Sequence, residues 1–543
     1  MLFRSGGGFI GLEVAENLRH LGLDVTIVQR PKQLMNPFDS DMASFIHAEM
    51  RKHGLKLALG YSVEGFEEKN GGMDVLLKDR EPIHADMVVL AIGVTPESTL
   101  AREAGLALGM KGSILVNDRM ETSVPDIYAV GDAVQVKHYL TGHDALIALA
   151  GPANKQGRIA ADNICGGDSR YLGSQGSSVI KVFDMTAATT GINETNARKS
   201  GLDVDTVILS PMSHAGYYPG GKVMTMKVVF EKGTYRLLGA QIVGYDGVDK
   251  RIDVLSTAIH AGMKATELKD LDLAYAPPYS SAKDPVNMAG FMIDNICGGD
   301  SRYPGSQGSS VIKVFDMTAA TTGINETNAR KAGLDVDTVI LSPMSHAGYY
   351  PGGKVMTMKV VFEKGTYRLL GAQIVGYDGV DKRIDVLATA IHAGMKATEL
   401  KDLDLAYAPP YSSAKDPVNM AGFMIDNISR GLKQWHLADA DKLPRDGSVT
   451  LLDTRTTGEY SRGHIDGFKN IPVDELRERI SEIEAGKKIY VICQSGLRSY
   501  IATRILEGYG FEAYNFAGGF RFYDAVMNDR ALVEKAYSCG MDK

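Results

Sequence analysis

The sequence predicts a multidomain protein in which α/β and α+β domains follow one another. The chain has 543 residues, a length that corresponds to three or four domains at ~150 residues each. Residues 162–293 recur almost unchanged as residues 294–425. Strand-like and helix-like segments alternate near both ends of the chain, a pattern that is typical of parallel α/β sheets.

Composition narrows the class of protein. Charged residues make up 23% and the hydrophobic set 44% of the chain, as in ordinary folded domains. The net charge of −7 gives no electrostatic reason to bind nucleic acid or an anionic membrane. The apolar run from Met87 to Val94 is much shorter than the ~20 residues that cross a bilayer. We therefore predict a cytoplasmic protein with no nucleic-acid or membrane partner and no metal site.

Cysteine is rare in the chain. The four cysteines are Cys165, Cys297, Cys493 and Cys539. This number is too small for a disulfide framework and fits a reducing compartment. Each thiol therefore has to be considered individually.

The duplicated segment differs between its two copies at only three positions, which are Leu172/Pro304, Ser200/Ala332 and Ser256/Ala388. The tripeptide Asp-Asn-Ile begins at Asp162, Asp294 and Asp426 and so bounds each copy. Slippage or recombination between these short matches explains the repeat. Solenoid repeats are shorter and more divergent, so the pattern indicates a recent duplication or an assembly error.

A glycine-rich turn opens the chain. Gly6, Gly8 and Gly11 are spaced as G-x-G-x-x-G and are followed by an apolar-periodic helix and a strand, VTIVQ. In that setting the glycines allow backbone amides at a helix N-terminus to approach a pyrophosphate. We predict a dinucleotide site here; the alternative is a tight turn that binds nothing.

The end of that second strand departs from the usual Rossmann pattern. Gln29 stands where an acidic residue would hold the ribose hydroxyls, and Arg30 and Lys32 follow. A cation there can meet a 2′-phosphate, so NADPH is a candidate beside NADH; alternatively both charges are simply solvated. The opening residues MLFRS do not resemble a hydrophobic first strand. We expect a degraded first strand and loss of the native N-terminal region.

Two later motifs carry a family resemblance. They are AIGVTPES, which contains Gly93, and DIYAVGDAV, which contains Gly131 and Asp132. Together they resemble the pyridine nucleotide-disulfide oxidoreductase family. The resemblance implies FAD as a cofactor, with Asp132 holding its ribityl chain. The alternative is that Gly131 and Asp132 only cap the next helix.

Each copy of the duplicated segment alternates short β-rich runs with helices, which predicts an α+β domain with an antiparallel sheet. The passages HAGYYPGGK and YAPPYSSAKDPVN resemble the dimerisation domain of the coenzyme A-disulfide reductase branch. The resemblance implies that phenols reach across the dimer into the partner's active site, and the candidates are Tyr218 and Tyr279, or Tyr350 and Tyr411. The alternative is packing of tyrosine at an interface. We expect a homodimer or an internal pseudo-dimer of the two copies.

That branch also implies an active-site cysteine and a second G-x-G-x-x-G in an N-terminal flavin domain, and neither is found in this sequence. No motif supports Cys165 or Cys297 as that nucleophile. We therefore expect structural roles for both thiols, and weak FAD binding with an impaired reductase half.

The last part of the chain predicts a sulfur-carrying cysteine. Cys493 ends an apolar strand and is followed by a short loop and a helix. Amides from Gln494 to Arg498 can surround the sulfur and stabilise a thiolate or a persulfide, while Arg498 holds an anionic donor or acceptor. Asp453, Arg455 and His464 are expected to be scaffold contacts around this loop, and Cys539 a free surface thiol or a second sulfur carrier.

The loop Cys-x-x-Gly-x-Arg, together with GHIDGFKNIP, resembles rhodaneses. A tyrosine-phosphatase loop, Cys-x5-Arg, would have one more intervening residue. A merely buried cysteine at a strand end is the other alternative.

Taken together, the resemblance implies a flavoprotein that uses NAD(P)H to reduce coenzyme A disulfide, persulfide or polysulfide, with Cys493 receiving sulfur from a polysulfide or thiosulfate donor. Two alternatives remain open: a non-catalytic assembly module with sulfurtransferase activity alone, and an NAD(P)H oxidase-like flavoprotein. The expected domains are a Rossmann-like NAD(P)-binding domain (1–95), a flavin-domain remnant (96–161), dimerisation copies (162–293 and 294–425), a linker (426–445) and a rhodanese-like α/β domain (446–543).

Overall fold

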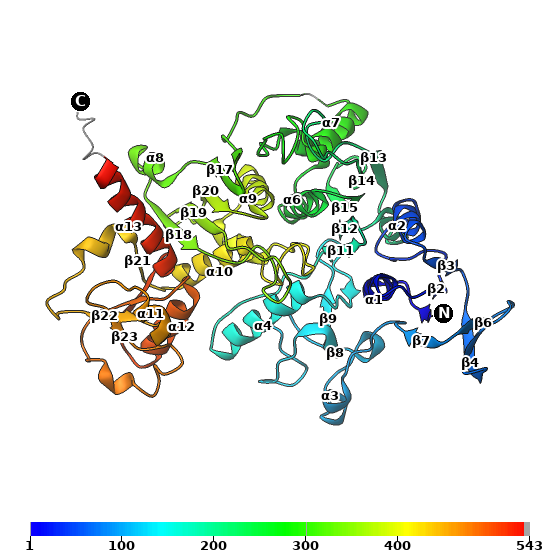
Figure 1. Cartoon of the computed structure of the whole chain (residues 1–543), viewed down its shortest axis with the longest axis horizontal. Helices are drawn as coiled ribbons and strands as arrows, with labels where there is room; N and C mark the ends of the chain where they lie inside the picture. The colour runs from blue at the N-terminus through cyan, green and yellow to red at the C-terminus, as the bar shows by residue number, and fades with distance from the viewer. Residues whose placement is uncertain (1, 300, 537–543) are drawn as a thin grey trace.

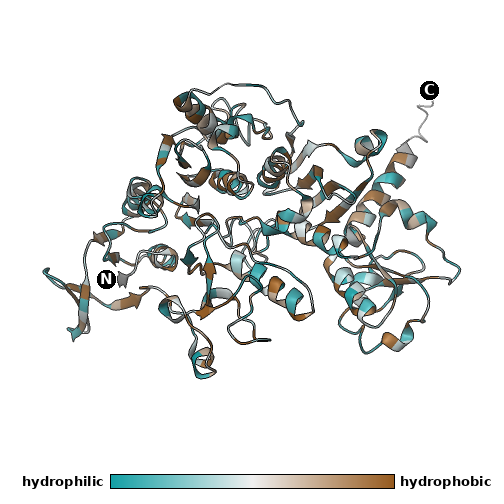
Figure 2. Cartoon of the chain, turned by 180° about the vertical axis from the view of Figure 1, so that it is seen from behind, coloured by the Kyte–Doolittle hydropathy of each residue, from teal (hydrophilic) through white to brown (hydrophobic). Residues whose placement is uncertain are grey.

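The computed structural model describes residues 2–299 and 301–536. The chain runs from a small N-terminal sheet, through the two copies, to a C-terminal α/β domain (Figure 1). Hydrophobic residues concentrate in the helices and strands (Figure 2). Within the described ranges, no helix combines the length and the apolar character that crossing a membrane requires.

The N-terminal domain is a parallel sheet in the order β3-β2-β1-β7. Its strands are β1 (Leu2–Ser5), β2 (Val25–Gln29), β3 (Lys56–Leu59) and β7 (Met87–Leu90), accompanied by the helices α1 (Phe9–His20) and α2 (Ser40–Lys52). The expectation of a degraded first strand is wrong in one respect: β1 is short, yet it pairs in parallel with both β2 and β7. Backbone hydrogen bonds suffice for such pairing without a fully apolar strand.

Two small sheets accompany this domain. An antiparallel meander contains β4 (Val63–Lys69), β5 (Gly72–Leu77) and β6 (Ile83–Ala85). After α3 (Thr99–Glu103), a second sheet contains β8 (Ile114–Leu115), β9 (Val134–Lys137) and β10 (Asp144–Ala145), and it leads into α4 (Ala150–Ile164). This second sheet and α4 correspond to the predicted flavin-domain remnant.

The two copies have the same fold. Copy 1 has the sheet order β11-β12-β15-β14-β13 and copy 2 the order β16-β17-β20-β19-β18, with antiparallel pairing throughout. Copy 1 comprises β11 (Ser178–Val182), β12 (Met185–Gly191), α5 (Glu194–Lys199), β13 (Val204–Leu209), β14 (Met224–Glu231), β15 (Leu237–Gly244), α6 (Val248–His260) and α7 (Pro285–Cys297). Copy 2 comprises β16 (Ser310–Val314), β17 (Met317–Gly323), α8 (Glu326–Lys331), β18 (Val336–Leu341), β19 (Thr357–Glu363), β20 (Leu369–Gly376), α9 (Val380–His392) and α10 (Pro417–Ser429). The predicted α+β architecture is confirmed.

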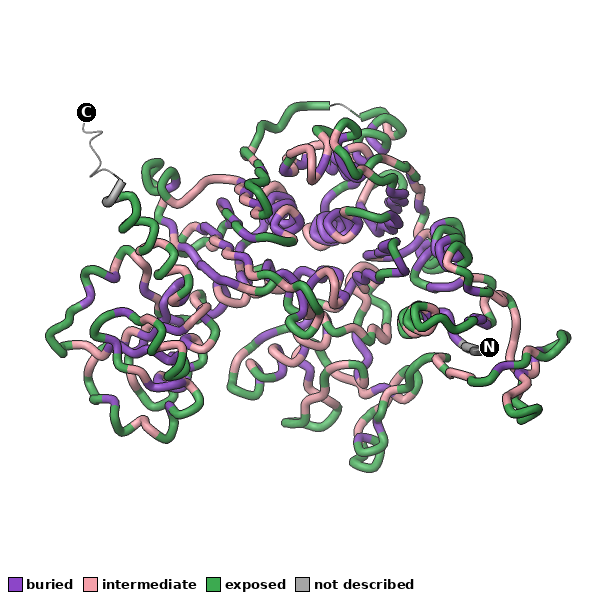
Figure 3. The backbone as a smooth tube through the Cα atoms, viewed as in Figure 1, coloured by how far each residue is buried: buried purple, intermediate pink, exposed green. Residues whose placement is uncertain are grey.

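The copies pack against each other through α6 and α9, where the backbone is largely buried (Figure 3). Lys250 Nζ lies 2.7 Å from Asp385 Oδ2, and Lys382 Nζ lies 2.9 Å from Asp253 Oδ2. Burial raises the pKa of both aspartates to about 6, against the lowering effect of the lysines. The two pairs are related by exchange of the copies, which is the signature of a twofold interface.

Further contacts repeat the same exchange. Asp404 of copy 2 accepts hydrogen bonds from Ser174 Oγ (2.6 Å) and the Gln175 amide (3.0 Å) in the loop before β11 of copy 1. Asp272 of copy 1 accepts the equivalent bonds from Ser306 Oγ (2.5 Å) and the Gln307 amide (2.8 Å) in the loop before β16 of copy 2. Each of these two loops is therefore held in place by hydrogen bonds to an aspartate of the other copy.

The C-terminal domain is an all-parallel sheet in the order β21-β25-β24-β22-β23. Its elements are β21 (Gln434–Trp435), β22 (Thr450–Asp453), α11 (Thr457–Ser461), β23 (Lys469–Asn470), β24 (Ile489–Ile492), α12 (Leu497–Gly508), β25 (Ala513–Phe516) and α13 (Gly519–Ala536). The predicted linker 426–445 is not free, because β21 joins the sheet edge and Trp435 is buried against Phe516, with ring centroids 4.2 Å apart.

The reciprocal ion pairs predict a matched pair of mutational effects. Asp385→Asn removes the nearer counter-charge of the buried Lys250 and leaves only Asp381, 3.6 Å away, which should lower the free energy of unfolding by about 3 kcal/mol, the lower end for a broken buried pair. Asp253→Asn should cost a similar amount through Lys382. Denaturant titration followed by circular dichroism measures both, and Asp203→Asn, which removes an exposed carboxylate, is the control. An effect of Asp385→Asn no larger than this control would contradict the interface.

Candidate functional site

The glycine-rich turn lies between β1 and the N-terminus of α1, at the carboxyl edge of the parallel sheet. Gly6 has φ 112°, and a Cβ built there would lie 1.9 Å from the Ala91 carbonyl oxygen. Only glycine fits so close to the neighbouring chain. The turn therefore leaves the first amides of α1 facing the space beyond the sheet edge, where an anionic group is stabilised.

A cavity of about 750 Å³ opens at this edge. The predicted cofactor residues that line it are Gly6, Gly8, Gln29, Arg30 and Gly93. Gly11 is buried in α1 and is not among the lining residues. The structure thus gathers five residues from three separate segments around one space with the dimensions of a ligand pocket.

Gln29 has a local role in this cavity. Its Oε1 accepts a hydrogen bond of 2.9 Å from the Gly7 amide, so the side chain fastens the glycine turn. Arg30 beside it is exposed and lines the cavity. Gln29 therefore occupies the position of the Rossmann carboxylate, and the cation of Arg30 follows it at the edge of the cavity.

Gly131 and Asp132 lie outside that cavity, in the short 3-10 turn η2 (Gly131–Ala133) before β9. The Gly131 amide donates to Gln156 Oε1 of α4 at 2.7 Å, and Asp132 is exposed. The helix-cap alternative for Asp132 is wrong, because η2 begins after Val130 and has no side-chain cap. An exposed carboxylate can accept from a polyol hydroxyl, so Asp132 fits one contact to FAD.

The second candidate centre is the loop after β24. Cys493 follows the strand directly, and its Sγ accepts hydrogen bonds from the Gly496 amide (3.1 Å) and from Ser499 Oγ (3.2 Å). Gly496, with φ 103°, precedes the first residue of α12. The sulfur thus lies at a helix N-terminus with two donors, an arrangement that favours an anionic sulfur.

The donors differ from those predicted. Among the described contacts to Sγ, one amide of the segment from Gln494 to Arg498 takes part, together with the hydroxyl of Ser499, which the sequence interpretation missed. Ser499 comes one residue after the Cys-x-x-Gly-x-Arg motif, so inspecting the first turn of the following helix would have indicated it. Cys493 itself is fully buried.

Arg498 is held by a carboxylate. Its two terminal nitrogens each lie 2.7 Å from one oxygen of Glu459. The hydrogen bonds from Arg498 are the main cause of lowering the pKa of Glu459 to about 2. Arg498, which the sequence predicts to hold an anionic donor or acceptor, is therefore paired with Glu459 in this structure. Thr456 and Glu459 form a capping box at α11, and that spacing was the available signal for Glu459.

Several side-chain and backbone contacts hold the Cys493 loop in place. Arg455 pairs with the buried Asp453 at 2.7 Å, and its guanidinium stacks on Phe520 at 3.8 Å from the ring centroid. The Phe520 amide donates to the Cys493 carbonyl oxygen at 2.7 Å. His464 stacks on Tyr460. These contacts fix the loop and leave the chemistry to the sulfur and its two donors.

The predicted tyrosines form two pairs at the interface between the copies. Tyr279 of copy 1 hydrogen-bonds to Thr318 of copy 2 at 2.6 Å, and Tyr411 of copy 2 hydrogen-bonds to Thr186 of copy 1 at 2.7 Å. Tyr218 and Tyr350 pack edge-on against His214 and His346. The Tyr279 and Tyr411 phenols therefore cross the interface within one chain, whereas the Tyr218 and Tyr350 rings pack within their own copies.

Only one of these pairs lies near the N-terminal domain. Burial raises the pKa of Tyr411, and the charges of Asp249 and of Glu16 on α1 add to this effect. The charge of Asp381, the counterpart of Asp249, likewise raises the pKa of Tyr279, so the charge of Glu16 is what distinguishes the surroundings of Tyr411. The duplicated sequence thus places identical tyrosines in different surroundings.

The remaining thiols lie at helix ends. Cys165 is exposed at the end of α4, and Cys297 is half-buried at the end of α7, where burial raises its pKa. Cys539 lies outside the described residues. None of the described contacts brings Cys165 or Cys297 to the nucleotide cavity.

Comparison with known families divides the chain in the same way as its fold. The pyridine nucleotide-disulphide oxidoreductase family matches residues 2–157, its dimerisation domain matches 177–285 and 309–417, and the rhodanese-like domain matches 436–525. The dimerisation domain matches twice because this segment of the chain is duplicated.

Two curated proteins illustrate the similarity. A Pyrococcus abyssi NAD(P)H sulfur oxidoreductase (CoA-dependent) is 36% identical over 52% of this chain and 63% of its own length. A Staphylococcus aureus coenzyme A disulfide reductase is 34% identical over 53% of this chain and 64% of its own length. The chain thus spans less than two thirds of the length of these relatives.

Solved structures extend the match over nearly the whole chain. Reduced CoADR-RHD of Bacillus anthracis is 35% identical, with 97% of this chain and 71% of that chain covered and a TM-score of 0.52. An NAD-dependent persulfide reductase from A. fulgidus is 29% identical, with 96% and 71% covered and a TM-score of 0.53. The chain belongs to the pyridine nucleotide-disulfide oxidoreductase family, in the coenzyme A-disulfide reductase branch that carries a C-terminal rhodanese domain.

Proposed function

We propose that this protein transfers sulfur through a Cys493 persulfide and belongs to an NAD(P)H-dependent system that reduces coenzyme A disulfide, persulfide or polysulfide. The observation that carries the proposal is the placement of Cys493 Sγ between the Gly496 amide and the Ser499 hydroxyl. The similarity to proteins described as coenzyme A disulfide and persulfide reductases supports it.

The sulfur step follows from that geometry. The Cys493 thiolate attacks the outer sulfur of thiosulfate or a polysulfide; the donor S–S bond breaks, and sulfite or a shortened polysulfide leaves with the bonding electrons. The product is a Cys493 persulfide anion. Gly496 and Ser499 can then donate to the sulfur anion, and an acceptor thiolate, such as that of coenzyme A, takes the outer sulfur and restores the Cys493 thiolate.

The N-terminal cavity would supply the reductant. Gly6 and Gly8 place amides at the α1 terminus for the pyrophosphate, and Arg30 offers a charge for the 2′-phosphate of NADPH. FAD, when bound with Asp132 at its ribityl chain, would pass electrons from the nicotinamide to the sulfur substrate. Tyr411 and Tyr350 of copy 2 are the phenols we assign to this half, because Tyr411 lies near α1. The internal pairing of the copies would take the place of a homodimer.

A second candidate is sulfurtransferase activity alone. The Cys493 loop is complete, whereas Asp132 is the single residue that fits a contact to FAD. This difference favours sulfur transfer without a reductase half. The absorbance spectrum of the purified protein separates the two candidates, since a bound flavin absorbs in the visible range and an apoprotein does not.

Cys493→Ala should abolish sulfur transfer, because the side chain that forms the persulfide is removed. A thiosulfate or polysulfide sulfurtransferase assay, with mass spectrometry of the Cys493 peptide for one added sulfur, measures this. Cys165→Ala is the control and should retain full activity. Equal activity in Cys493→Ala and the unmodified protein would rule out the proposal.

Ser499→Ala should lower the sulfur-transfer rate by about tenfold or more, since a hydrogen bond to a charged group contributes about 1.5–3 kcal/mol. Ser495→Ala, in the same loop but without a described bond to Sγ, is the matched control. Steady-state rates at several pH values test this, because loss of a thiolate donor should move the activity profile to higher pH. An unchanged rate and profile would show that Ser499 is only structural.

Arg30→Ala should weaken NADPH binding by about tenfold while leaving NADH within about twofold, because only NADPH carries the extra phosphate. Isothermal titration of each nucleotide measures this without requiring turnover. Lys56→Ala, which removes an exposed cation outside the cavity lining, is the control. Equal losses for both nucleotides would contradict the role of Arg30.

A further inference from the structure

The N-terminal domain rests on one face of the sheet of copy 1. Phe183 and Ile180 of copy 1 share a buried apolar cluster with Met42 and Ile46 of α2. The Phe183 ring stacks on His53, with the ring centroids 4.0 Å apart. This face is therefore the docking surface of copy 1 for the nucleotide-binding domain.

Polar contacts complete the same surface. Asp39 exchanges two hydrogen bonds of 2.7 Å with Gln241 and lies 3.2 Å from Lys227 Nζ. Burial would raise the pKa of Asp39, but hydrogen bonds from Thr195 and Gln241 and the charge of Lys227 lower it overall. The docking surface thus combines an apolar centre with a specific buried charge pair.

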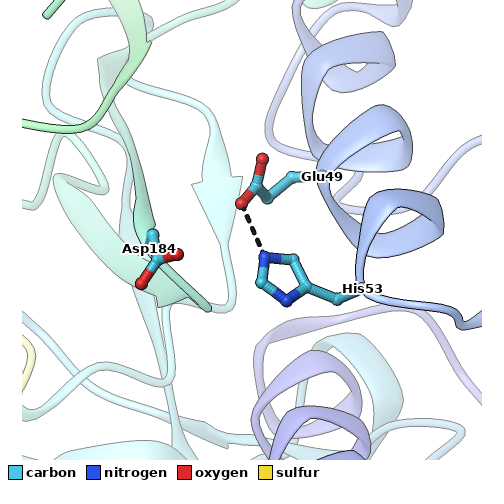
Figure 4. A group of neighbouring side chains, drawn as sticks. All are labelled: Glu49, His53 and Asp184. Atoms are coloured by element: carbon cyan, nitrogen blue, oxygen red, sulfur yellow. Dashed lines mark hydrogen bonds and ion pairs between the residues drawn. The ribbon is translucent and has the colours of Figure 1, made fainter.

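Glu49 and His53 of α2 face Asp184 at the β11–β12 turn of copy 1 (Figure 4). The spacing of their ligand atoms would suit a metal ion. However, the Glu49 oxygens already accept from Lys52 and from Tyr245 and lie 3.0 Å from His53 Nε2. Because the Lys52 ammonium would repel a cation, this group is a polar contact across the docking surface.

Copy 2 presents the same residues without an occupant. Phe183 is 3% exposed in copy 1, whereas its counterpart Phe315 is 94% exposed; Ile180 is 0% and Ile312 58% exposed. Val314, Val375 and Gln373 are likewise exposed, whereas their counterparts Val182, Val243 and Gln241 are buried. Exposed apolar residues gathered on one sheet face mark an interaction surface.

A second uncovered face lies on α7 of copy 1. In copy 2, α10 is covered by α4: Arg158 lies 4.7 Å from the centre of the Phe423 ring and donates to Asn427 at 2.8 Å. In copy 1, the equivalent residues of α7 are exposed, including Phe291 and Ile296. The exposed sheet face of copy 2 is related by the twofold axis to the sheet face of copy 1 that the N-terminal domain covers. The exposed face of α7 is related in the same way to the face of α10 that α4 covers.

We propose that the β16–β17–β20 face of copy 2 is a second docking site for a nucleotide-binding domain of the same surface chemistry, supplied by another polypeptide. The chain's own domain occupies copy 1, so it does not fill this site. The occupant is defined by its contacts: an apolar helix side for Phe315 and Ile312, and a carboxylate such as Asp39 for Lys359. Lys359 here pairs with Glu326 at 2.5 Å, whereas its counterpart Lys227 also meets Asp39 and Asp41.

The test uses two full-length chains. The donor carries Phe183→Asp and Phe315→Asp, so its nucleotide-binding domain is released from copy 1 and its own copy 2 cannot receive one. Mixed with the unmodified chain, the donor should form a complex of two chains, at twice 58.6 kDa, by light scattering. A receiving chain with Phe315→Asp alone should bind the donor at least about tenfold more weakly, the loss expected for a central apolar contact.

A second donor carries Lys227→Glu and Lys359→Glu instead. In this donor, charge repulsion releases the nucleotide-binding domain from copy 1, and the apolar centre of the docking surface is unchanged. Circular dichroism shows which donor is folded. The site is supported if a folded donor binds the unmodified chain and binds the Phe315→Asp chain at least about tenfold more weakly. No complex, or an equal complex with both receiving chains, would overturn it.

Discussion

Two buried ion pairs, Lys250 with Asp385 and Lys382 with Asp253, set the relation between the two copies. A charge removed from water is tolerated only beside its counter-charge, and each copy carries one partner of each pair. Neither copy can therefore bury α6 or α9 without the other. The loops held by Asp272 and Asp404 and the phenols of Tyr279 and Tyr411 lie at the interface that this pairing sets.

Identical sequences lie in different surroundings because the N-terminal domain packs on the sheet face of copy 1 and leaves the equivalent face of copy 2 exposed. Tyr411 feels the charge of Glu16 on α1, whereas Tyr279 faces copy 2. Phe183 is buried beneath α2, whereas Phe315 is in solvent. The asymmetry lies in the surroundings rather than in the residues, so the chain resembles a dimer in which one half lacks its partner domain. The sulfur loop is independent of this asymmetry, since its contacts all lie in the C-terminal domain.

Features encoded by neighbouring residues could be predicted from the sequence. The glycine turn and the strand-end position of Cys493 depend on local spacing, and both occur in the structure as predicted. Features that depend on contacts between residues far apart in the sequence could not be predicted. Glu459 meets Arg498 from another helix, Trp435 joins a sheet edge beside β25, and Gln29 turns back to the Gly7 amide. The sequence showed the repeat, but it did not show which surface of each copy other parts of the chain would cover.

The particle mass of the unmodified protein tests the intrachain pairing most directly. Pairing of the copies within one chain occupies both α6 and α9, so light scattering at micromolar concentration should give a single chain of 58.6 kDa. A stable dimer that dissociates when Asp253 and Asp385 are both replaced by asparagine would show that the copies pair between chains, and would contradict the single-chain pseudo-dimer.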